Sequence, residues 1–385
     1  MTSDGKLSAA PAPVREHFNI VHMLRGVAAL WVVLFHIHSL ALTWYFRESW
    51  PEPLYRLVFE FGRGGIAVFF VLSGCVIAQS LHGKTLDWRG LGQFAVRRSL
   101  RLDPPYFASI ALALAVTAAF AVLQGRPVAL PGIGVIAAHL VYLQELLRME
   151  PISVVFWTLT YEIQFYLVFA LLLVLRSALE RRGAPALIIR LPEIAALLLA
   201  FYGAAVGPGW ALYGLFANYW YAFFLGVLVQ RAVIAGGSRV LVLLLAAVML
   251  ATAHRTAEVF NTPAALTGLA LLAAGIVWRF QAARAPRTLM GLGTISYSLY
   301  LTHYPVLLVS LKPAFDVREA VGSVLAVAFQ LACVLAAALA FWWAIERPSQ
   351  RWAQRFKIGP ARRPSAAPIS EAAIAPNARA SEAGF

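Results

Sequence analysis

The sequence predicts an all-α integral membrane protein with about ten transmembrane helices and both termini in the cytoplasm. Of its 385 residues, 61% are hydrophobic and only 13% are charged, whereas about a quarter of the residues of a soluble domain are charged. The apolar residues come in runs of about 20, the length that crosses about 30 Å of hydrocarbon. The basic residues fall mostly on one side of these runs. Lipid is therefore the solvent of most of the chain.

The apolar runs define ten spans, at residues 18–44, 62–81, 102–123, 154–175, 191–207, 210–229, 239–254, 262–279, 291–311 and 320–345. Another apolar segment, 132–147, is short and carries His139, Gln144 and Glu145. If it crossed the membrane, every later loop would change sides. We therefore expect it to be a re-entrant or interfacial segment on the outer side.

The distribution of positive charge supports this topology. With the N-terminus in the cytoplasm, 24 of the 32 Lys and Arg residues lie on the inner side and 8 on the outer side, as the positive-inside rule requires. The net charge of +14 is thus a topology signal, and we expect no nucleic-acid partner. The two cysteines, Cys75 and Cys333, lie within apolar runs, so neither a disulfide framework nor a metal site is expected.

The chain divides into three parts. Residues 1–16 lack the features of a cleavable signal peptide. These residues and the segment 357–385, which is rich in Ala, Pro and Ser, are expected to be disordered and cytoplasmic. Residues 17–356 form the transmembrane domain. Any chemistry is therefore expected within the membrane region or at its faces.

The first span carries two ionisable residues on one face. Arg25 and His36 are 11 residues apart, close to three helical turns, so they lie about 16 Å apart along the axis. Ionisable side chains in a span are costly and often functional, and a histidine can take a proton from a hydroxyl and return it to a leaving group. A packed histidine bonded to another helix is the alternative. His38 points elsewhere, toward the interface.

Two further ionisable residues are expected near the depth of His36. Glu162 lies near the outer start of the fourth span, with Tyr166 one turn further on. His303 lies in the ninth span, at a similar or slightly shallower depth. Three ionisable groups from distant segments would then share one layer in the outer half of the bilayer. The alternative for Glu162 is a structural partner for an arginine of another helix.

A basic cluster precedes the third span. Arg97, Arg98 and Arg101 are followed closely by Pro104 and Pro105. Two adjacent prolines restrict the backbone and so aim the cluster, and guanidinium groups held in this way suit phosphate binding. The alternative is that these arginines only follow the positive-inside rule and bind no ligand.

Six segments resemble the acyltransferase 3 family of bacterial inner-membrane acyltransferases, and they occur in the order of that family. They are RGVAALWVVLFH (25–36), GIAVFFVLSGCVI (65–77), RRSLRLDPPY (97–106), WTLTYEIQFYL (157–167), ISYSLYLTHYPV (295–306) and IERP (345–348). The resemblance implies ten core helices, a location in the bacterial inner membrane, and O-acylation of carbohydrates or small glycosylated molecules. It also implies acetyl-CoA or another acyl-CoA as the donor.

The residue pattern and the resemblance together define the expected site. His36 and Glu162 are expected to be catalytic; many members have a second acidic residue after the glutamate, where this chain has Ile163. The expected donor-binding residues are Arg25, Arg97, Arg98 and Arg101. The expected substrate-binding residues are Tyr166, Tyr297 and His303. The expected partners are acyl-CoA, a carbohydrate acceptor and membrane lipid.

The expected reaction begins with acyl-CoA docked from the cytoplasm, with its phosphates on the arginine cluster and its thioester extended toward His36. His36 then deprotonates an acceptor hydroxyl from the outer side, while Glu162 orients the imidazole or the hydroxyl. An acyl-histidine intermediate is equally allowed. A proton-coupled secondary transporter is the main alternative, weakened by the lack of an internal repeat. A sensor that binds acyl-CoA without turnover is a third hypothesis.

Overall fold

The structure is a computed structural model that describes residues 19–256, 258–278 and 286–355. Within these ranges the chain forms helices and connecting turns, without a strand. The expected all-α integral membrane fold is therefore confirmed. The terminal segments expected to be disordered, 1–16 and 357–385, lie outside the described residues.

Each of the ten expected spans contains a helix. These helices are α1 (Asn19–Ser39), α3 (Gly65–Leu81), α4 (Trp88–Leu123), α6 (Trp157–Arg181), α7 (Ala186–Val206), α8 (Trp220–Ile234), α9 (Arg239–Thr256), α10 (Glu258–Trp278), α11 (Arg287–Val321) and α12 (Ser323–Phe341). In the described part of the chain, seven helical runs are long and apolar enough to cross a membrane, and α8 and α9 are shorter apolar helices. The count of ten spans and the cytoplasmic side of both termini stay predictions.

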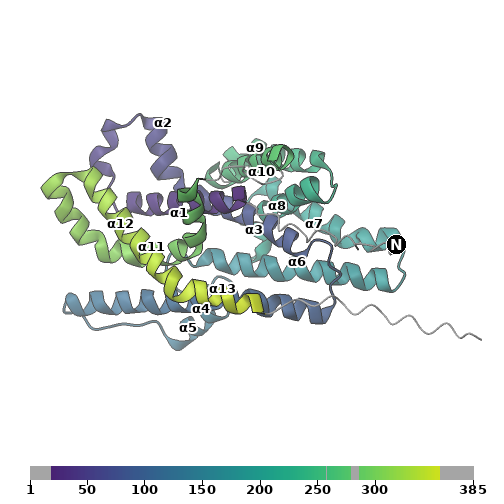
Figure 1. The fold of residues 1–385 in the computed structure, drawn as a ribbon, viewed down its shortest axis with the longest axis horizontal. Coiled ribbons are helices and arrows are strands. Elements are labelled where there is room, and N and C mark those ends of the chain that lie inside the picture. Colours follow the sequence, from purple (N-terminus) through teal and green to yellow (C-terminus); the bar gives the residue numbers. More distant parts are fainter. Residues whose placement is uncertain (1–18, 257, 279–285, 356–385) are drawn as a thin grey trace, which may run out of the picture.

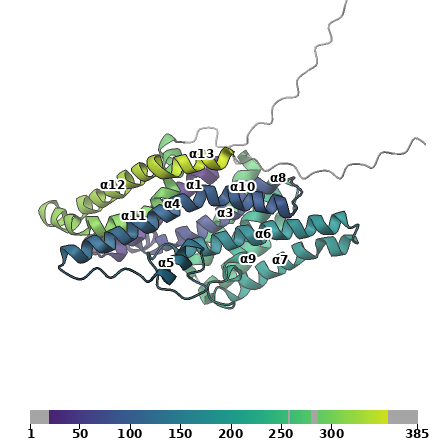
Figure 2. The ribbon, with the colours of Figure 1, turned by 90° about the horizontal axis from the view of Figure 1, so that it is seen from below.

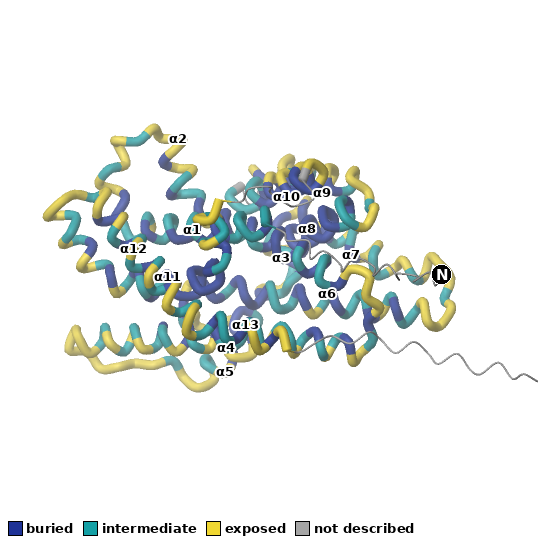
Figure 3. The backbone as a smooth tube through the Cα atoms, viewed as in Figure 1, coloured by how far each residue is buried: buried dark blue, intermediate teal, exposed yellow. Residues whose placement is uncertain are grey.

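The helices form two groups that meet at α3. Figure 1 shows α1, α11 and α12 on one side, together with the hairpin that carries α2 (Glu52–Tyr55), and α6 to α10 on the other. Helix α3 contacts both α1 and α8. Figure 3 shows buried residues concentrated around α3 and α8 and exposed residues around α2. Polar residues that face this buried centre are therefore shielded from lipid.

Helix α4 begins earlier than the hydropathy pattern predicts. The expected third span starts at residue 102, but the helix starts at Trp88, where the side chain of Asp87 accepts a hydrogen bond of 2.7 Å from the backbone N–H of Gly90. A carboxylate in this position caps a helix N-terminus. The three arginines therefore lie on a helix and not in a loop, and Pro104 and Pro105 lie inside it.

The segment 132–147 does not cross the molecule. It forms α5 (Ile133–Leu140), whose eight residues extend only about 12 Å. The Tyr142 ring then stacks on Tyr106 of α4, with ring centroids 4.8 Å apart, and its hydroxyl donates to Asp103 at 2.8 Å. Asp103 is about 30 Å along the helix from the end of α4 at Leu123. The chain thus folds back along α4, as a re-entrant segment does, and Figures 1 and 2 both place α5 beside this helix.

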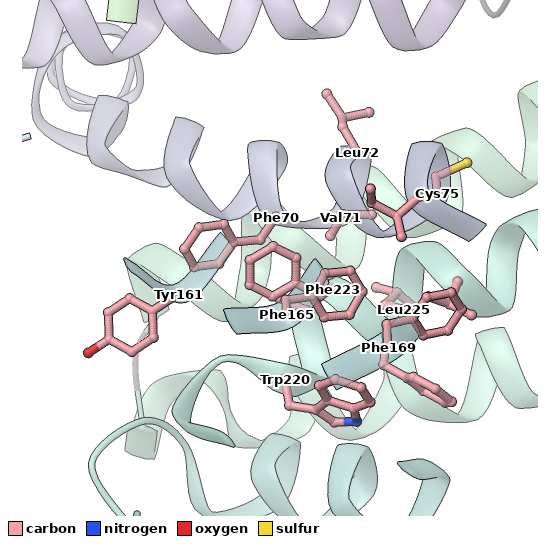
Figure 4. Packing of buried hydrophobic residues seen from close by; sticks show 14 of the residues in the cluster. Phe70, Val71, Leu72, Cys75, Tyr161, Phe165, Phe169, Trp220, Phe223 and Leu225 are labelled. Carbon is pink, nitrogen blue, oxygen red and sulfur yellow. The ribbon is translucent and has the colours of Figure 1, made fainter. Parts of the chain in front are cut away.

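Small residues allow α3 and α8 to pack backbone against backbone. A Cβ atom added to Gly74 would lie 1.8 Å from the carbonyl oxygen of Phe223. Figure 4 shows the aromatic cluster beside this crossing. The Phe223 ring stacks on Phe70 and on Phe165, with centroids 4.2 and 4.4 Å apart. Close approach of this kind is the usual source of helix association in lipid.

Gly74→Ala is therefore expected to lower the melting temperature of the detergent-solubilised protein. The added methyl group meets backbone atoms that no side-chain rotation can remove, and overpacking of a core typically costs about 1–3 kcal/mol. Gly134→Ala in α5 is the matched control, because a Cβ there has no neighbour within 4 Å. Equal melting temperatures for the two variants would contradict the close packing of α3 on α8.

Candidate active site

His36 and His303 face each other between α1 and α11. Their ring centroids are 5.1 Å apart, and the Tyr304 ring lies 5.3 Å from His36. The two helices approach closely where a Cβ on Gly26 would lie 2.6 Å from the backbone nitrogen of Gly293. This contact sets the two helices in register. The expected meeting of His36 and His303 at one depth is therefore found.

The hydrogen bonds of His303 define its tautomer. The side chain is fully buried, and Nδ1 lies 2.8 Å from the carbonyl oxygen of Tyr300 and 3.1 Å from that of Leu299. Carbonyl oxygens only accept, so Nδ1 carries the hydrogen and Nε2 is an acceptor. Within the described residues Nε2 has no hydrogen-bond partner, and it is available to accept a hydrogen bond.

His38 has different surroundings from His36. Its Nδ1 lies 2.8 Å from the Thr43 hydroxyl and 3.1 Å from the Tyr55 hydroxyl. Tyr55 belongs to the hairpin beyond the end of α1. As expected, His38 points away from the face that carries Arg25 and His36.

A small cavity of about 30 Å³ lies along the side of α3. Its walls are formed by Arg25, Ile66, Phe69, Phe70, Thr158, Leu159, Glu162, Ser296, Tyr297 and Tyr300. The Tyr300 hydroxyl contacts Thr158 at 2.8 Å and donates to the carbonyl oxygen of Val155 at 2.8 Å. Tyr300 also neighbours His303, with ring centroids 5.9 Å apart. It therefore links this cavity to the histidine pair.

Glu162 lies in this cavity and not beside the histidines, which corrects the expectation of one shared layer. Its carboxylate accepts hydrogen bonds from Ser73, at 2.6 Å, and from Tyr166. Among the described residues neither histidine is a hydrogen-bond partner of this carboxylate. Glu162 shares its cavity with Arg25, which is about 16 Å along α1 from His36. A direct contact between Glu162 and His36, as in a triad, is therefore not formed.

The arginine cluster lines a second and larger cavity of about 310 Å³. Its walls are formed by Val76, Ser80, Lys84, Phe94, Arg97, Arg98, Arg101, Gln350, Ala353 and Gln354. Four of these side chains are cationic and none is acidic. Partial desolvation, and then the charge of Arg97, lowers the pKa of Lys84. A bound polyanion would offset the mutual repulsion of the four cations.

Tyr166 lies between the two cavities and contacts one lining residue of each. The guanidinium of Arg98, in the larger cavity, lies 4.9 Å from the centroid of the Tyr166 ring, and the Tyr166 hydroxyl donates to Glu162 in the smaller one. Tyr297 lines the smaller cavity and donates to the backbone carbonyl of Leu102 on α4 at 3.1 Å. The residues expected for the site thus line one of the two cavities or connect to them through ring contacts and hydrogen bonds, although their separate roles stay predictions.

The hydropathy argument missed one buried carboxylate. Glu346 is 3% exposed and accepts hydrogen bonds from the backbone N–H of Ser298, at 3.0 Å, and from its hydroxyl. It also interacts electrostatically with Arg101 and Arg25. Glu346 follows the last apolar run. It therefore does not lie inside a predicted span, where an ionisable residue would have been costly and so conspicuous. The IERP motif was the available signal.

The chain was compared with protein families, with curated proteins and with solved structures. A family model described as an acyltransferase domain matches residues 18–347. No curated protein and no solved structure matches. The matched range includes the arginines that line the two cavities, Glu162, and the pair His36 and His303. The chain therefore belongs to the acyltransferase 3 family and is a multi-pass membrane acyltransferase.

Proposed function

We propose that this protein transfers an acyl group, acetyl in the simplest case, from cytoplasmic acyl-CoA to a hydroxyl of a cell-surface or lipid-linked glycan. The observation that supports the proposal is the order of the groups along one path. A cavity with four cations is followed by the contact of Arg98 with Tyr166, then by the smaller cavity, and then by Tyr300 and the histidines. This order matches acyl-CoA, in which phosphates, a narrow pantetheine arm and a thioester follow one another.

In the proposed donor complex, the phosphates of acyl-CoA bind to the guanidinium groups of Arg97, Arg98 and Arg101 by charge-assisted hydrogen bonds. The pantetheine arm passes Tyr166 toward the smaller cavity, which has to widen to admit it because its volume is only about 30 Å³. Arg25 and Glu162 lie there together and provide a hydrogen-bond donor and a hydrogen-bond acceptor for the amide groups of the arm. Glu162 thus acts on acyl-CoA and not on the imidazole of His36.

In the proposed chemical step, His36 takes the proton of the acceptor hydroxyl as its oxygen attacks the thioester carbonyl. The C–S bond then breaks, and the sulfur of CoA receives the proton from His36. In this step the half-buried His36 ring turns so that its single N–H donates to Nε2 of His303, while its other nitrogen is the base. This hydrogen bond holds the other ring nitrogen of His36 toward the hydroxyl of the glycan substrate. His303 thus has the role that a carboxylate has in a triad.

The proposal is tested by mass spectrometry of surface glycans from host cells with and without the protein, together with release of CoA from acetyl-CoA by the purified protein. We expect glycans heavier by one or more acyl groups and CoA release that depends on the acceptor. Unchanged glycans and no CoA release would contradict it. Proton flux without acyl transfer would instead support a transporter.

The orienting role of His303 makes a separate prediction. His303→Asn keeps a polar group near the backbone carbonyls but removes the acceptor at the position of Nε2, whereas His303→Gln places an amide oxygen there. We expect the asparagine variant to lose about 10- to 100-fold in rate, the effect of an unmade buried hydrogen bond, and the glutamine variant to keep most of it. Acyl transfer rates measured at equal protein levels check this. Equal rates for both variants would show that Nε2 has no such role.

A further inference from the structure

The two prolines in α4 leave two backbone carbonyls without helical partners. In a helix, the carbonyl of each residue accepts from the N–H four residues later. Pro104 and Pro105 have no N–H, so the carbonyls of Leu100 and Arg101 cannot be paired within α4. Both carbonyls lie in the turn that carries the arginine cluster. A buried carbonyl that lacks a partner costs roughly 1–3 kcal/mol.

One side chain, distant in the sequence, shares a single hydroxyl hydrogen between both carbonyls. The Ser349 hydroxyl lies 2.7 Å from the carbonyl oxygen of Leu100 and 3.0 Å from that of Arg101. Ser349 is fully buried and belongs to α13 (Arg347–Arg355), the last described helix. Helix α13 packs on α4, and Figure 1 shows the two side by side. The hydroxyl therefore fastens α13 to the proline break of α4.

This attachment places α13 in the wall of the larger cavity. Gln350, Ala353 and Gln354 line it together with the arginines of α4 and Lys84. The Gln350 side chain also donates to Glu346 at 2.7 Å. All three lining residues follow residue 347, where the family match ends. Helix α13 thus supplies part of the cavity wall from outside the matched range.

The two walls differ in chemistry. The α4 wall and Lys84 offer only charged donors, which suit phosphates. The α13 wall offers glutamine amides, each of which has donors and an acceptor on one plane. A glutamine amide matches the paired donor and acceptor on the edge of adenine. The cationic side chains alone would suffice to bind a polyphosphate, which has no base for the glutamine amides to recognise.

We propose that α13 recognises the adenine nucleotide end of acyl-CoA through Gln354 and Gln350, and that Ser349 is the residue that positions α13 for this. The inference rests on the proposed function, since it takes acyl-CoA as the donor. It assigns the arginines to the phosphates and α13 to the base. The protein therefore selects a donor that carries a nucleotide over a phosphopantetheine thioester without one.

The test compares the binding of CoA and of 4′-phosphopantetheine, which lacks the nucleotide, to the full-length protein in detergent. Gln354→Ala is expected to weaken CoA binding roughly three- to tenfold, the effect of a lost hydrogen bond, and to leave phosphopantetheine binding unchanged. Gln124→Ala, at the opposite end of α4, is the control and should bind both compounds as the wild type does.

Ser349→Ala tests the positioning. It is expected to lower the affinity for CoA more than that for phosphopantetheine, because only CoA reaches α13, whereas general misfolding would lower both equally. Equal CoA affinity of wild type and Gln354→Ala would overturn the assignment of α13 and leave the proposed function standing. A wild-type protein that bound neither compound would overturn both.

Discussion

Replacing His36 by glutamine is expected to abolish acyl transfer while the protein still folds and inserts. Removal of a general base typically costs about 10²- to 10⁴-fold in rate. Glutamine keeps a polar side chain of similar size but cannot accept the proton of the acceptor hydroxyl. His36 is half-buried and contacts His303 and Tyr304 by its ring, so the local packing changes little. The measurement is the acyl content of surface glycans at equal protein levels.

His38→Gln is the matched control, on the same helix and only two residues away. Its ring contacts Thr43 and Tyr55 outside the face of His36, so we expect most of the activity to remain. Substantial activity in His36→Gln would refute proton transfer at this position and transfer the role to His303. Equal loss in both variants would indicate damage to α1 rather than to the chemistry.

Removing both Arg98 and Arg101 is expected to prevent donor binding. Each lost charge-assisted contact to a phosphate costs about 1.5–3 kcal/mol, roughly tenfold or more in affinity. Both residues line the larger cavity, where they repel neighbouring arginines and also interact favourably with Glu162, and Arg101 with Glu346. Two lost contacts should together weaken the binding of CoA by at least about 100-fold.

Arg89→Ala is the control for this double variant. Arg89 also lies on α4, but it is exposed and does not line the cavity. Its loss should leave CoA binding unchanged, as measured by titration of CoA into the solubilised protein. If the double variant bound CoA as tightly as Arg89→Ala does, the arginines would serve only to orient the protein in the membrane.

Some features of the site depend on local sequence and could be predicted without a structure. Helical periodicity alone places Arg25 and His36 on one face of α1 and turns His38 away from it. Hydropathy alone locates the spans, because the membrane interior imposes a minimum length and excludes unpaired charge. The cationic cavity also follows from three arginines within one short stretch of helix.

The depth of Glu162 could not be predicted in this way. Hydropathy shows that a span begins near residue 154, but it does not show where that end lies relative to the other helices. The preceding segment folds back along α4 through Tyr142 and Asp103, so α6 begins beside Tyr300 rather than at the level of the outer end of α1. Glu162 consequently shares a cavity with Arg25 and accepts a hydrogen bond from Ser73, and it does not contact His36.

The sequence by itself determined which residues are polar within apolar spans and which of them share a helix face, since both depend on neighbours within a few turns. Only the tertiary structure decided which of these residues meet. The pairing of His36 with His303 depends on the close approach of α1 and α11 at Gly26 and Gly293. The hydrogen bonds from Ser349 to α4 join residues 248 and 249 positions apart. Lipid drives each helix to form but is equally apolar on every side, so the register between helices is set by side-chain packing and buried hydrogen bonds.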